Sequence, residues 1–563
     1  MATSLPTYTG DTTALIQPTG NPLTDALIVG SKWGTGPAGT GASVTFSFPA
    51  AVALFDTTAG VAGNYNPAEV TQSGFAAYLQ GFGALDAAAQ AAARGVLAAW
   101  ASVANIQFTE VAATDVNAGV LRFAMSGPPG LGATTYGVSS FPQDFAGAGD
   151  TWMNSAFLFP EGWAAGTQNY LTLLHEAGHA IGLKHPHDTG MNGSPGWPAT
   201  PAVLEKIGDD TLVRYSTQNM VMAYNDIPGI GSPVQADFAP TTPMQVDIAA
   251  IQYLYGPNLA YNAGNTTYTF ASTARYNQTI WDGGGTDTIR VDGDAPAIIN
   301  LTPGTWSALG LPLTFSERNA NLTVLQARPD LTDPGTVFIY DTVTIENAIG
   351  GAGNDRILGN AAANRLQGGG GDDTIDGAAG IDGAVFAAAR SASTLTRTEA
   401  GWTVASPSDG TDTLANIERL YFGDGALAVD TTGSGHAAQT AQVIRALFGS
   451  AYLGNPAFVG IGLSLFDQGT SYADIVALAI GTSIFEGLAG SRSNTDFVNL
   501  VYRNVIGSEP SPTDLAGFVA QLDAGSFTQA SLGLLACQVS FNANSAELVG
   551  LAASGIEFVP AGG

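Results

Sequence analysis

The sequence predicts a multidomain protein in which a mixed α/β domain is followed by a parallel β-roll and then by an all-α domain. Three observations support this order. Ala-rich segments with helical spacing alternate with β-like runs up to residue 257, short strands with a nine-residue period follow, and apolar residues at i, i+3 and i+4 return after residue 430. We therefore expect domains at residues 21–257, 258–430 and 431–563. Residues 1–20, rich in Thr, Pro and Gly, are expected to be a leader or short pro-segment.

The composition excludes several classes of function. The 563 residues include 18 Lys and Arg against 47 Asp and Glu, so the formal net charge is −29. A chain this acidic is repelled by phosphate backbones and anionic lipids, so cations are expected partners and nucleic acid is not. No apolar run reaches the length of a transmembrane segment, and the N-terminus lacks the pattern of a signal peptide. The single Cys537 excludes a disulfide framework and is expected to lie in a helical core.

In the first domain we expect two helices, two strands and a closing apolar segment. Asp86 stands at the N-cap position of an Ala-rich helix predicted over residues 86–102. Strands are predicted over residues 106–111 and 120–125, a second helix over 169–182, and the domain is expected to close with the apolar segment 246–255.

Four of the five histidines lie within thirteen residues, in the segment TLLHEAGHAIGLKHPHD. His175 and His179 are four residues apart, so on a helix they project from one face and can bind one metal ion. Gly182 can end the helix with a left-handed turn, which lets the chain double back so that His185 supplies a third ligand. Three neutral imidazoles leave one position open for water, which is typical of a catalytic rather than a structural zinc site.

Glu176, next to the first of these histidines, can accept a proton from zinc-bound water and pass it to the leaving amine of a peptide bond. Zinc lowers the pKa of such a water toward about 7 and polarises the scissile carbonyl. The full spacing H-E-x-x-H-x-x-G-x-x-H is far more specific than H-E-x-x-H alone, which occurs by chance in unrelated helices. The motif therefore predicts one catalytic zinc ion and hydrolysis of protein or peptide substrates.

The nine-residue period is clearest from residue 350 to residue 385. Four consecutive units read GGAGNDRIL, GNAAANRLQ, GGGGDDTID and GAAGIDGAV. The first and third match G-G-x-G-x-D-x-U-x, with Asp355 and Asp373 at the sixth place, whereas the other two are degenerate. Two units make one coil of a β-roll whose turns aim carbonyls and carboxylates at calcium. The alternative, a Gly-rich linker, predicts neither the period nor the fixed Asp, so we expect folding of this region to depend on calcium.

The motif HEAGHAIGLKHP resembles that of the serralysins, the secreted bacterial branch of the metzincin zinc endopeptidases, in which Pro186 directly follows the third histidine. The resemblance extends over about residues 21–430, and it implies an α/β metzincin catalytic domain followed by an RTX calcium-binding domain that is a parallel β-roll/β-sandwich. It also implies that Met222, in the segment NMVMAYND, packs under the zinc ligands as a Met-turn. Tyr224 would then coordinate zinc in the resting site and stabilise the oxyanion. His187 is expected at the edge of the cleft or next to the ligands, rather than to bind the metal itself.

The same resemblance implies several structural calcium ions. The implied ligands are Asp282, Gly284 and Asp287 in one site, Gly285, Asp287, Thr344 and Glu346 in a second, and Gly351, Gly353 and Asp355 facing Gly368, Gly370 and Asp373 in the roll. Asn262 and Asn265 stand where the family usually has Arg and Asp, so the first site is expected to be weaker or lost.

Two functions of different classes are compatible with the sequence. The first is a secreted, calcium-stabilised zinc endopeptidase, and the alternative is a catalytically inert surface or adhesion protein that binds through its roll and helical domain. The first is favoured because Glu176, three histidines, Met222 and Tyr224 are all present. RTX repeats without an N-terminal signal resemble substrates of bacterial type I secretion, which implies export by that machinery through a C-terminal signal. The helical domain resembles those of bacterial RTX and surface-layer-associated proteins, which implies a surface-layer or other extracellular partner and a cell-surface location.

Overall fold

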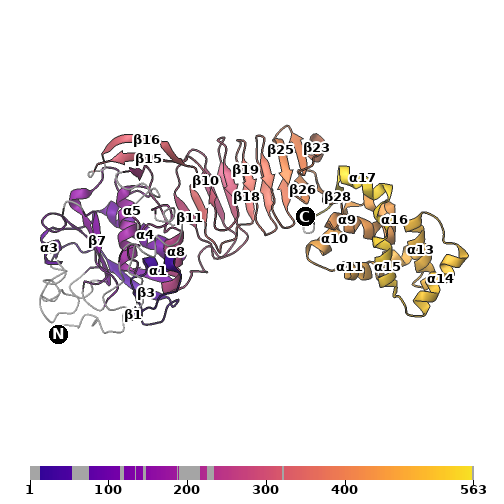
Figure 1. Cartoon of the computed structure of the whole chain (residues 1–563), viewed down its shortest axis with the longest axis horizontal. Coiled ribbons are helices and arrows are strands. Elements are labelled where there is room, and N and C mark those ends of the chain that lie inside the picture. Colours follow the sequence, from indigo (N-terminus) through magenta and orange to yellow (C-terminus); the bar gives the residue numbers. More distant parts are fainter. Residues whose placement is uncertain are drawn as a thin grey trace. The chain divides into compact units, whose positions relative to one another are not determined.

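The computed structural model describes residues 13–52, 75–113, 119–132, 135–143, 147–186, 188, 216–224, 234–319 and 323–560 (Figure 1). The chain divides into two compact units. The first contains residues 1–266, 273–287 and 303–344, and the second contains residues 267–272, 288–302 and 345–563. Strands that follow residue 257 therefore belong to both units, and the second unit includes the β-roll together with the helical region.

A six-stranded sheet forms the centre of the first unit, in the order β5–β3–β6–β8–β7 with β4 also paired to β6. Its strands are β3 (Ala42–Ser47), β4 (Phe82–Gly83), β5 (Ile106–Glu110), β6 (Leu121–Ser126), β7 (Gly137–Ser139) and β8 (Thr151–Asn154). The strands β3, β5, β6 and β8 are parallel, whereas β7 pairs antiparallel with β8. The two strands predicted from the sequence, over 106–111 and 120–125, correspond to β5 and β6. Among the described residues, β7 is an edge strand of this sheet.

Two helices pack together beside this sheet, α4 (Ala87–Val103) and α5 (Gln168–Ala180). The Asp86 side chain accepts a hydrogen bond from the Ala89 N–H at 2.8 Å, so the predicted N-cap of α4 is confirmed. Trp100 of α4 is fully buried, and its Nε1 donates to the Leu174 carbonyl of α5 at 3.1 Å. The helix that carries the histidine motif is therefore held inside the unit and buried along nearly its whole length.

Shorter elements complete the first unit. They are β1 (Thr13–Leu15), α1 (Pro22–Leu27), β2 (Ser31–Trp33), α3 (Phe75–Gln80), a 3₁₀ turn (Ser155–Phe157), β9 (Val234–Ala236), α8 (Gln245–Tyr255), β11 (Gln278–Ile280), β14 (Trp306–Ser307), β15 (Leu313–Arg318), β16 (Val324–Asp333) and β17 (Val337–Ile339). The helix α8 agrees with the apolar segment predicted to close the first domain. Two small sheets have the orders β11–β17–β14 and β16–β15–β9.

The strand β1 lies inside the segment predicted to be a leader. It pairs antiparallel with β2, and the adjacent Ile16 is buried. The Tyr253 hydroxyl donates to the Gln17 carbonyl at 2.8 Å. Folded structure therefore begins before residue 21, and the remaining part of the predicted leader, residues 1–12, lies outside the described residues.

Two sheets of short strands form the roll of the second unit (Figure 1). One sheet contains β10 (Thr267–Ala271), β12 (Thr288–Asp292), β18 (Asn347–Ile349), β20 (Arg365–Gln367), β22 (Gly383–Val385), β26 (Arg419–Phe422), β27 (Gly425–Ala428) and β28 (Ile556–Phe558); the other contains β13 (Ile298–Asn300), β19 (Arg356–Leu358), β21 (Thr374–Asp376), β25 (Gly410–Ala415), β24 (Trp402–Ser406) and β23 (Thr394–Arg397). Ile357 pairs with Ile375, and Leu366 pairs with Ala384. Partners in neighbouring coils are thus two nine-residue units apart, as the sequence period predicts.

The helical region follows the roll in the same unit. Its elements are α9 (His436–Val443), a π-helical turn (Ile444–Phe448), a 3₁₀ turn (Ser450–Gly454), α10 (Pro456–Asp467), α11 (Tyr472–Ile480), α12 (Ser483–Ala489), α13 (Asn494–Ile506), α14 (Pro512–Asp523), α15 (Gln529–Gln538), α16 (Ser540–Ala543) and α17 (Ala546–Ser554). Cys537 is fully buried in its core, as predicted. In the described part of the chain no single helix is long and apolar enough to cross a membrane, and the bent pair α11–α12 meets the criteria of length and composition only.

The helical region and the roll share a sheet. The chain leaves the roll after β27 and returns as β28, which pairs antiparallel with β27. Arg419 of β26 is almost completely buried and forms ion pairs with Asp430 and with Asp467 of α10, both at 2.6 Å. Because a buried charge is costly when its partner is removed, these ion pairs couple α10 to the last coil of the roll.

Candidate metal centres

Three histidine side chains converge beside α5. The Nε2 atom of His185 lies 3.0 Å from the Nε2 atoms of both His175 and His179. His185 can reach the other two because the chain turns sharply at Gly182, whose φ is +111° and where a Cβ atom would lie 2.6 Å from the Ser31 carbonyl oxygen. Pro186, which follows, is buried.

Hydrogen bonds determine which ring nitrogens are available. The Nδ1 atoms of His175 and His179 lie 2.7 Å from the carbonyl oxygens of Val221 and Leu183, so Nδ1 must donate in each ring. Their Nε2 lone pairs then face His185. Burial, followed by the neighbouring histidines, holds the pKa of His179 well below its ordinary value, so that ring is neutral. Neutral nitrogen donors crowded in this way fit a bound cation such as zinc.

His185 is oriented by residues that the sequence analysis did not identify. Its Nδ1 lies 2.6 Å from Asp188 Oδ2. The buried Lys184 donates from Nζ to the Asp188 carbonyl at 2.8 Å and to the Ala26 carbonyl. Lys184 directly precedes His185 in the sequence, but its carbonyl partners are determined only by the fold. His187 lies outside the described residues.

Glu176 is buried beside the cluster and faces the edge strand β7. Burial raises its pKa to about 8, and a hydrogen bond from Ser139 of β7 acts in the opposite direction. The Ser139 hydroxyl also lies 2.7 Å from Thr151 Oγ1, and a Cβ atom on Gly137 would lie 2.8 Å from Glu176 Cγ. The carboxylate of Glu176 is therefore held between α5 and β7. The contact with Ser139 was missed because 37 residues separate it from Glu176 in the sequence.

The segment that contains Met222 and Tyr224 lies against the same cluster. Met222 is fully buried, and a Cβ atom on Gly178 of α5 would lie 2.6 Å from its Sδ. The Tyr224 hydroxyl lies 2.6 Å from His185 Nε2, although 63% of the residue is exposed. Partial burial, followed by the charges of Glu176 and Asp188, raises the pKa of Tyr224 to about 12. This hydroxyl therefore stays protonated at neutral pH.

A second carboxylate missed by the sequence analysis holds this segment in place. Asp247, in the first turn of α8, accepts hydrogen bonds from the N–H groups of Val221 at 2.7 Å and Met244 at 2.9 Å. The side chain is fully buried, which raises its pKa to about 7. A charged residue in an otherwise apolar helical segment was the available signal.

In the roll, the residues implied as calcium ligands occupy neighbouring coils. Gly351, Gly353 and Asp355 lie in one coil and Gly368, Gly370 and Asp373 in the next, with the Gly370 N–H donating to the Gly351 carbonyl at 2.9 Å. The N–H of Asp355 donates to Asp373 Oδ1 at 2.7 Å. The other oxygen, Asp373 Oδ2, is buried and has no hydrogen-bond partner among the described residues. Burial raises the pKa of Asp373 to about 6. A buried carboxylate in this state fits a bound cation.

The same ladder continues beyond the units recognised from the sequence. Asp373 N–H donates to Asp412 Oδ1 at 2.9 Å, and burial raises the pKa of Asp412 to about 7. In the alternate series, Asn364 N–H donates to Asp382 Oδ1 at 2.7 Å, and Asp382 N–H donates to Glu418 Oε2 at 2.8 Å. Asp382 holds the sixth place of the fourth unit, so its position in the period was the signal.

The remaining implied calcium ligands lie outside the nine-residue units. In the first unit, Asp282 Oδ1 accepts from the Gly284 N–H, and Asp287 Oδ1 accepts from the Thr266 N–H, both at 2.7 Å. Gly284 and Gly285 have φ values of +125° and +147°. In the same loop, Asn262 has a φ of +51°, and Asn265 Oδ1 accepts from the Thr286 N–H at 3.0 Å. Thr344 is exposed in the first unit, and Glu346 is half-buried in the second.

Comparisons with known proteins agree with both motifs. Residues 349–384 match the RTX calcium-binding nonapeptide repeat in four copies. The chain is 32% identical over 290 residues to Metalloprotease AprA of Pseudomonas entomophila (strain L48), 33% over 297 residues to Serralysin C of Dickeya chrysanthemi and 33% over 353 residues to Serralysin of Proteus mirabilis. These alignments cover 48%, 49% and 58% of this chain and 53%, 55% and 60% of the relatives, so the chain spans little more than half of their length. The chain is therefore a relative of the serralysins that carries RTX calcium-binding repeats.

Proposed function

We propose that the chain is an extracellular zinc endopeptidase whose fold is stabilised by calcium. The observation that carries this proposal is the buried carboxylate of Glu176 beside three convergent imidazole nitrogens. Three nitrogen donors with an adjacent general base are typical of sites that hydrolyse peptide bonds. The metalloprotease and serralysin names of the relatives support the same assignment.

In this proposal His175, His179 and His185 hold the zinc ion through Nε2. Zinc, when bound, lowers the pKa of water and polarises the scissile carbonyl. Glu176 takes the proton from the attacking water and delivers it to the leaving amine, a role that its position beside the three imidazoles allows. Tyr224, protonated and close to His185, donates a hydrogen bond to the oxygen on which negative charge develops.

The edge strand β7 supports a peptide as the substrate. A strand that is unpaired on one side can hydrogen-bond an extended peptide backbone. Because Ser139 and Gly137 of β7 contact Glu176, a peptide bound along this edge has its carbonyl groups near the base. Main-chain recognition of this kind accepts many sequences, which is consistent with a broad specificity.

Calcium is proposed to bind at the ligands implied by the resemblance, some of which lie between coils of the roll and others in the loops of the first unit. Since calcium is scarce inside cells and abundant outside, the roll would fold after export, which suits a chain passed unfolded through a type I secretion machinery. We further propose that the helical region binds a surface-layer or other extracellular protein and keeps the enzyme at the cell surface.

Cleavage of an unfolded protein substrate tests the enzymatic proposal. The purified chain, with zinc and calcium, is compared with Glu176→Ala, and zinc content is measured for both. We expect loss of activity by a factor of about 10² to 10⁴ in the variant, with zinc retained, because the imidazoles remain while the general base is removed. A zinc-loaded wild-type chain without activity would refute the proposal and favour an inert binding protein.

A further inference from the structure

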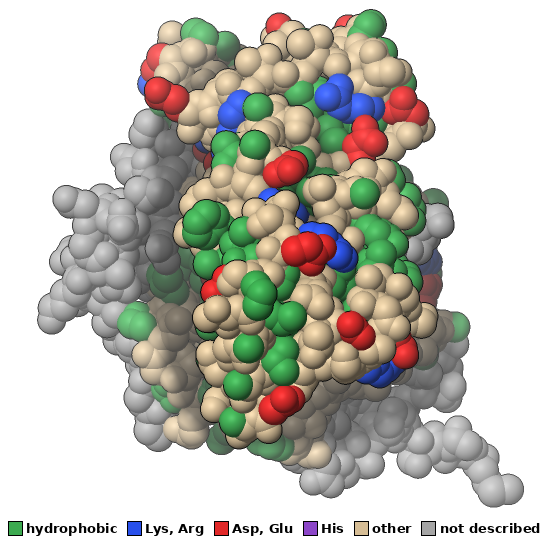
Figure 2. All heavy atoms as spheres, turned by 90° about the vertical axis from the view of Figure 1, so that its right-hand side faces the viewer, with side chains coloured by type: hydrophobic (Ala, Val, Ile, Leu, Met, Phe, Trp, Pro, Cys, Tyr) green, Lys and Arg blue, Asp and Glu red, His purple; other side chains and the backbone are tan. Residues whose placement is uncertain are grey.

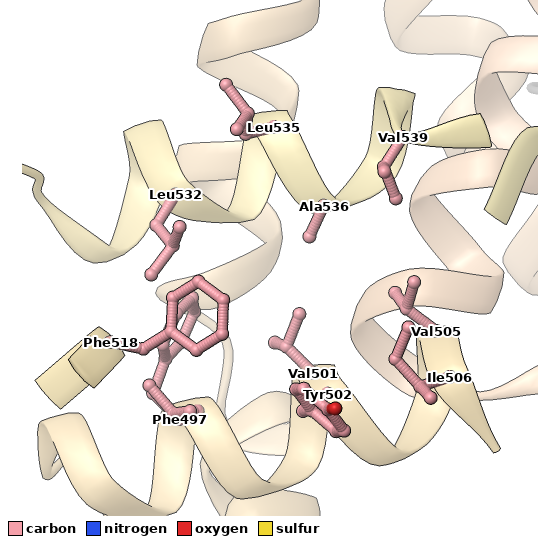
Figure 3. Close-up of a pocket in the computed structure, with 11 residues that line it drawn as sticks. Phe497, Val501, Tyr502, Val505, Ile506, Phe518, Leu532, Leu535, Ala536 and Val539 are labelled. Atoms are coloured by element: carbon pink, nitrogen blue, oxygen red, sulfur yellow. The ribbon is translucent and has the colours of Figure 1, made fainter. Parts of the chain in front are cut away.

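The helical region contains an apolar pocket that the proposed enzymatic function does not use. The cavity, of about 190 Å³, lies between α13 and α15 and is closed at one end by Phe518 of α14 (Figure 3). Side chains from the two helices point toward one another across it. The lining residues are Phe497, Val498, Val501, Tyr502, Val505, Ile506, Phe518, Leu532, Leu535, Ala536 and Val539. None of these side chains carries a charge.

The floor of the pocket is buried, whereas its rim is exposed to solvent. Phe497, Val501 and their neighbours on α13 belong to the helical core. At the rim, Leu535, Ile506 and Val539 are 58%, 42% and 38% exposed. Figure 2 shows hydrophobic side chains (green) exposed on one face of the molecule, with charged side chains between them. Large exposed apolar side chains around a pocket are typical of a binding surface.

The size of the cavity and the exposed rim favour a protein segment over a small apolar ligand. An engineered apolar cavity of about 150 Å³ holds one benzene molecule, so this pocket has room for one aromatic or branched aliphatic side chain. A single small molecule inside it would leave Leu535 and Val539 in water. A helix or extended segment that inserts one side chain would cover them as well.

The charge around the pocket indicates the partner's chemistry. Residues 431–560 contain nine Asp and Glu, three Arg and no Lys. Each Arg is already paired, Arg445 with Glu547, Arg492 with Glu486 and Arg503 with Glu509. Asp496, Asp514 and Asp523, on α13 and α14, have no basic partner among the described residues, and Asp514 lies 3.5 Å from the hydroxyl of the lining residue Tyr502. These acidic side chains attract Lys and Arg and repel an anionic lipid or fatty acid.

We propose that the pocket between α13 and α15 binds one large apolar side chain from a partner-protein segment that is otherwise rich in Lys and Arg. The binding does not depend on hydrolysis. It gives the helical region a docking site whose apolar anchor supplies affinity and whose acidic surroundings select the partner.

Binding of short labelled peptides to the full chain tests the proposal. The chain carries Glu176→Ala so that peptides are not cleaved, and fluorescence anisotropy is measured in calcium at low salt. The probe is an amphipathic peptide with one Phe flanked by Lys, and the comparison peptides replace Phe by Ala or every Lys by Glu. We expect each replacement to weaken binding about tenfold, because one removes the apolar anchor and the other the charge attraction.

Variants of the chain locate the binding. Ala536→Leu fills the cavity, and Leu535→Ser removes apolar area from the rim. Both should therefore weaken binding of the Phe peptide about tenfold. Leu478→Ser is the matched control, since Leu478 is 56% exposed on α11 and does not line the pocket. Circular dichroism checks that each variant is folded. If Ala536→Leu fails to fold, the comparison of the Phe peptide with its Phe→Ala form still tests the proposal, because it uses the unaltered pocket.

Any of the following outcomes would overturn the proposal. They are no binding of the Phe–Lys peptide, equal weakening by Leu478→Ser and Leu535→Ser, and equal binding of the Lys and Glu peptides. Displacement of the Phe–Lys peptide by decanoic acid at low concentration would also contradict it, because an acidic lipid would then be the preferred ligand.

Discussion

In the first unit, the Nδ1 atoms of His175 and His179 donate to backbone carbonyl groups. The third imidazole, His185, is held by the carboxylate of Asp188. In the second unit, carboxylates of the roll are held by backbone N–H groups of neighbouring coils, with one oxygen of Asp373 left buried and unpaired among the described residues. Neutral donors can be buried and oriented before a metal binds, whereas buried negative charges repel one another until a cation arrives. We therefore expect the first unit to fold without zinc and the roll to need calcium for folding.

Selective removal of each metal is expected to give the largest difference between these regions. Chelation of calcium should unfold the roll, because each occupied site adds about 2.7 kcal/mol when calcium is present at a hundredfold excess over its Kd. Removal of zinc with 1,10-phenanthroline should lower the thermal transition of the first unit, since zinc binds its folded state, but should leave the roll folded. Thermal melts followed by circular dichroism, in the Glu176→Ala background to prevent autolysis, measure both. Equal loss of stability on removal of either metal would contradict the comparison.

Asp373→Asn separates the carboxylate's charge from its hydrogen bond. Asparagine can still accept from the Asp355 N–H, as Asn364 accepts from Asn360 in the neighbouring unit. With calcium we expect a loss of about 2 kcal/mol of unfolding free energy, because a charged ligand is removed. Without calcium we expect a gain of up to about 1 kcal/mol at neutral pH, because repulsion is removed. Glu399→Gln, on the exposed turn between β23 and β24, is the control. A loss of stability in both conditions would refute the charge argument.

The pH dependence of the calcium-free roll follows from its raised pKa values. Burial raises the pKa of Asp373 to about 6 and those of Asp382 and Asp412 to about 7, from an ordinary value of 3.8. Between about pH 4 and pH 7 the folded state therefore binds more protons than the unfolded state, so its stability falls as the pH rises through this range. With calcium the trend should reverse, since the ligands must be deprotonated. Urea unfolding at several pH values, with calcium or a chelator, measures both slopes, and parallel slopes would contradict the prediction.

The smallest effect is expected from Ser139→Ala in the first unit. Loss of the Ser139 hydrogen bond leaves the Glu176 carboxylate less well oriented, so we expect kcat to fall by a factor of about 3 to 10 with little change in KM or zinc content. Ser140→Ala, the next position along the chain and just beyond the end of β7, is the matched control. A rise in KM with unchanged kcat would show that Ser139 acts on substrate binding rather than on the base.

Much of the candidate site was predictable because its signals are local. A four-residue spacing places His175 and His179 on one helical face, Asp86 caps its own helix, and a nine-residue period specifies the coils that contain Asp355 and Asp373. Each of these signals depends on chain geometry over a few residues, which is the same in any fold that admits the element.

Only the tertiary structure decided the contacts made across long separations. The hydroxyl of Ser139 reaches Glu176, Asp247 holds the turn before Met222, and Asp412 continues the ladder beyond the recognised units. In the same way β1 folds inside the predicted leader, and β28 returns to the roll through pairing with β27. The amino-acid sequence by itself predicted which side chains are candidates for holding metal ions. The tertiary structure decided their hydrogen-bond partners, because burial and pairing depend on which distant backbone groups lie within about 3 Å.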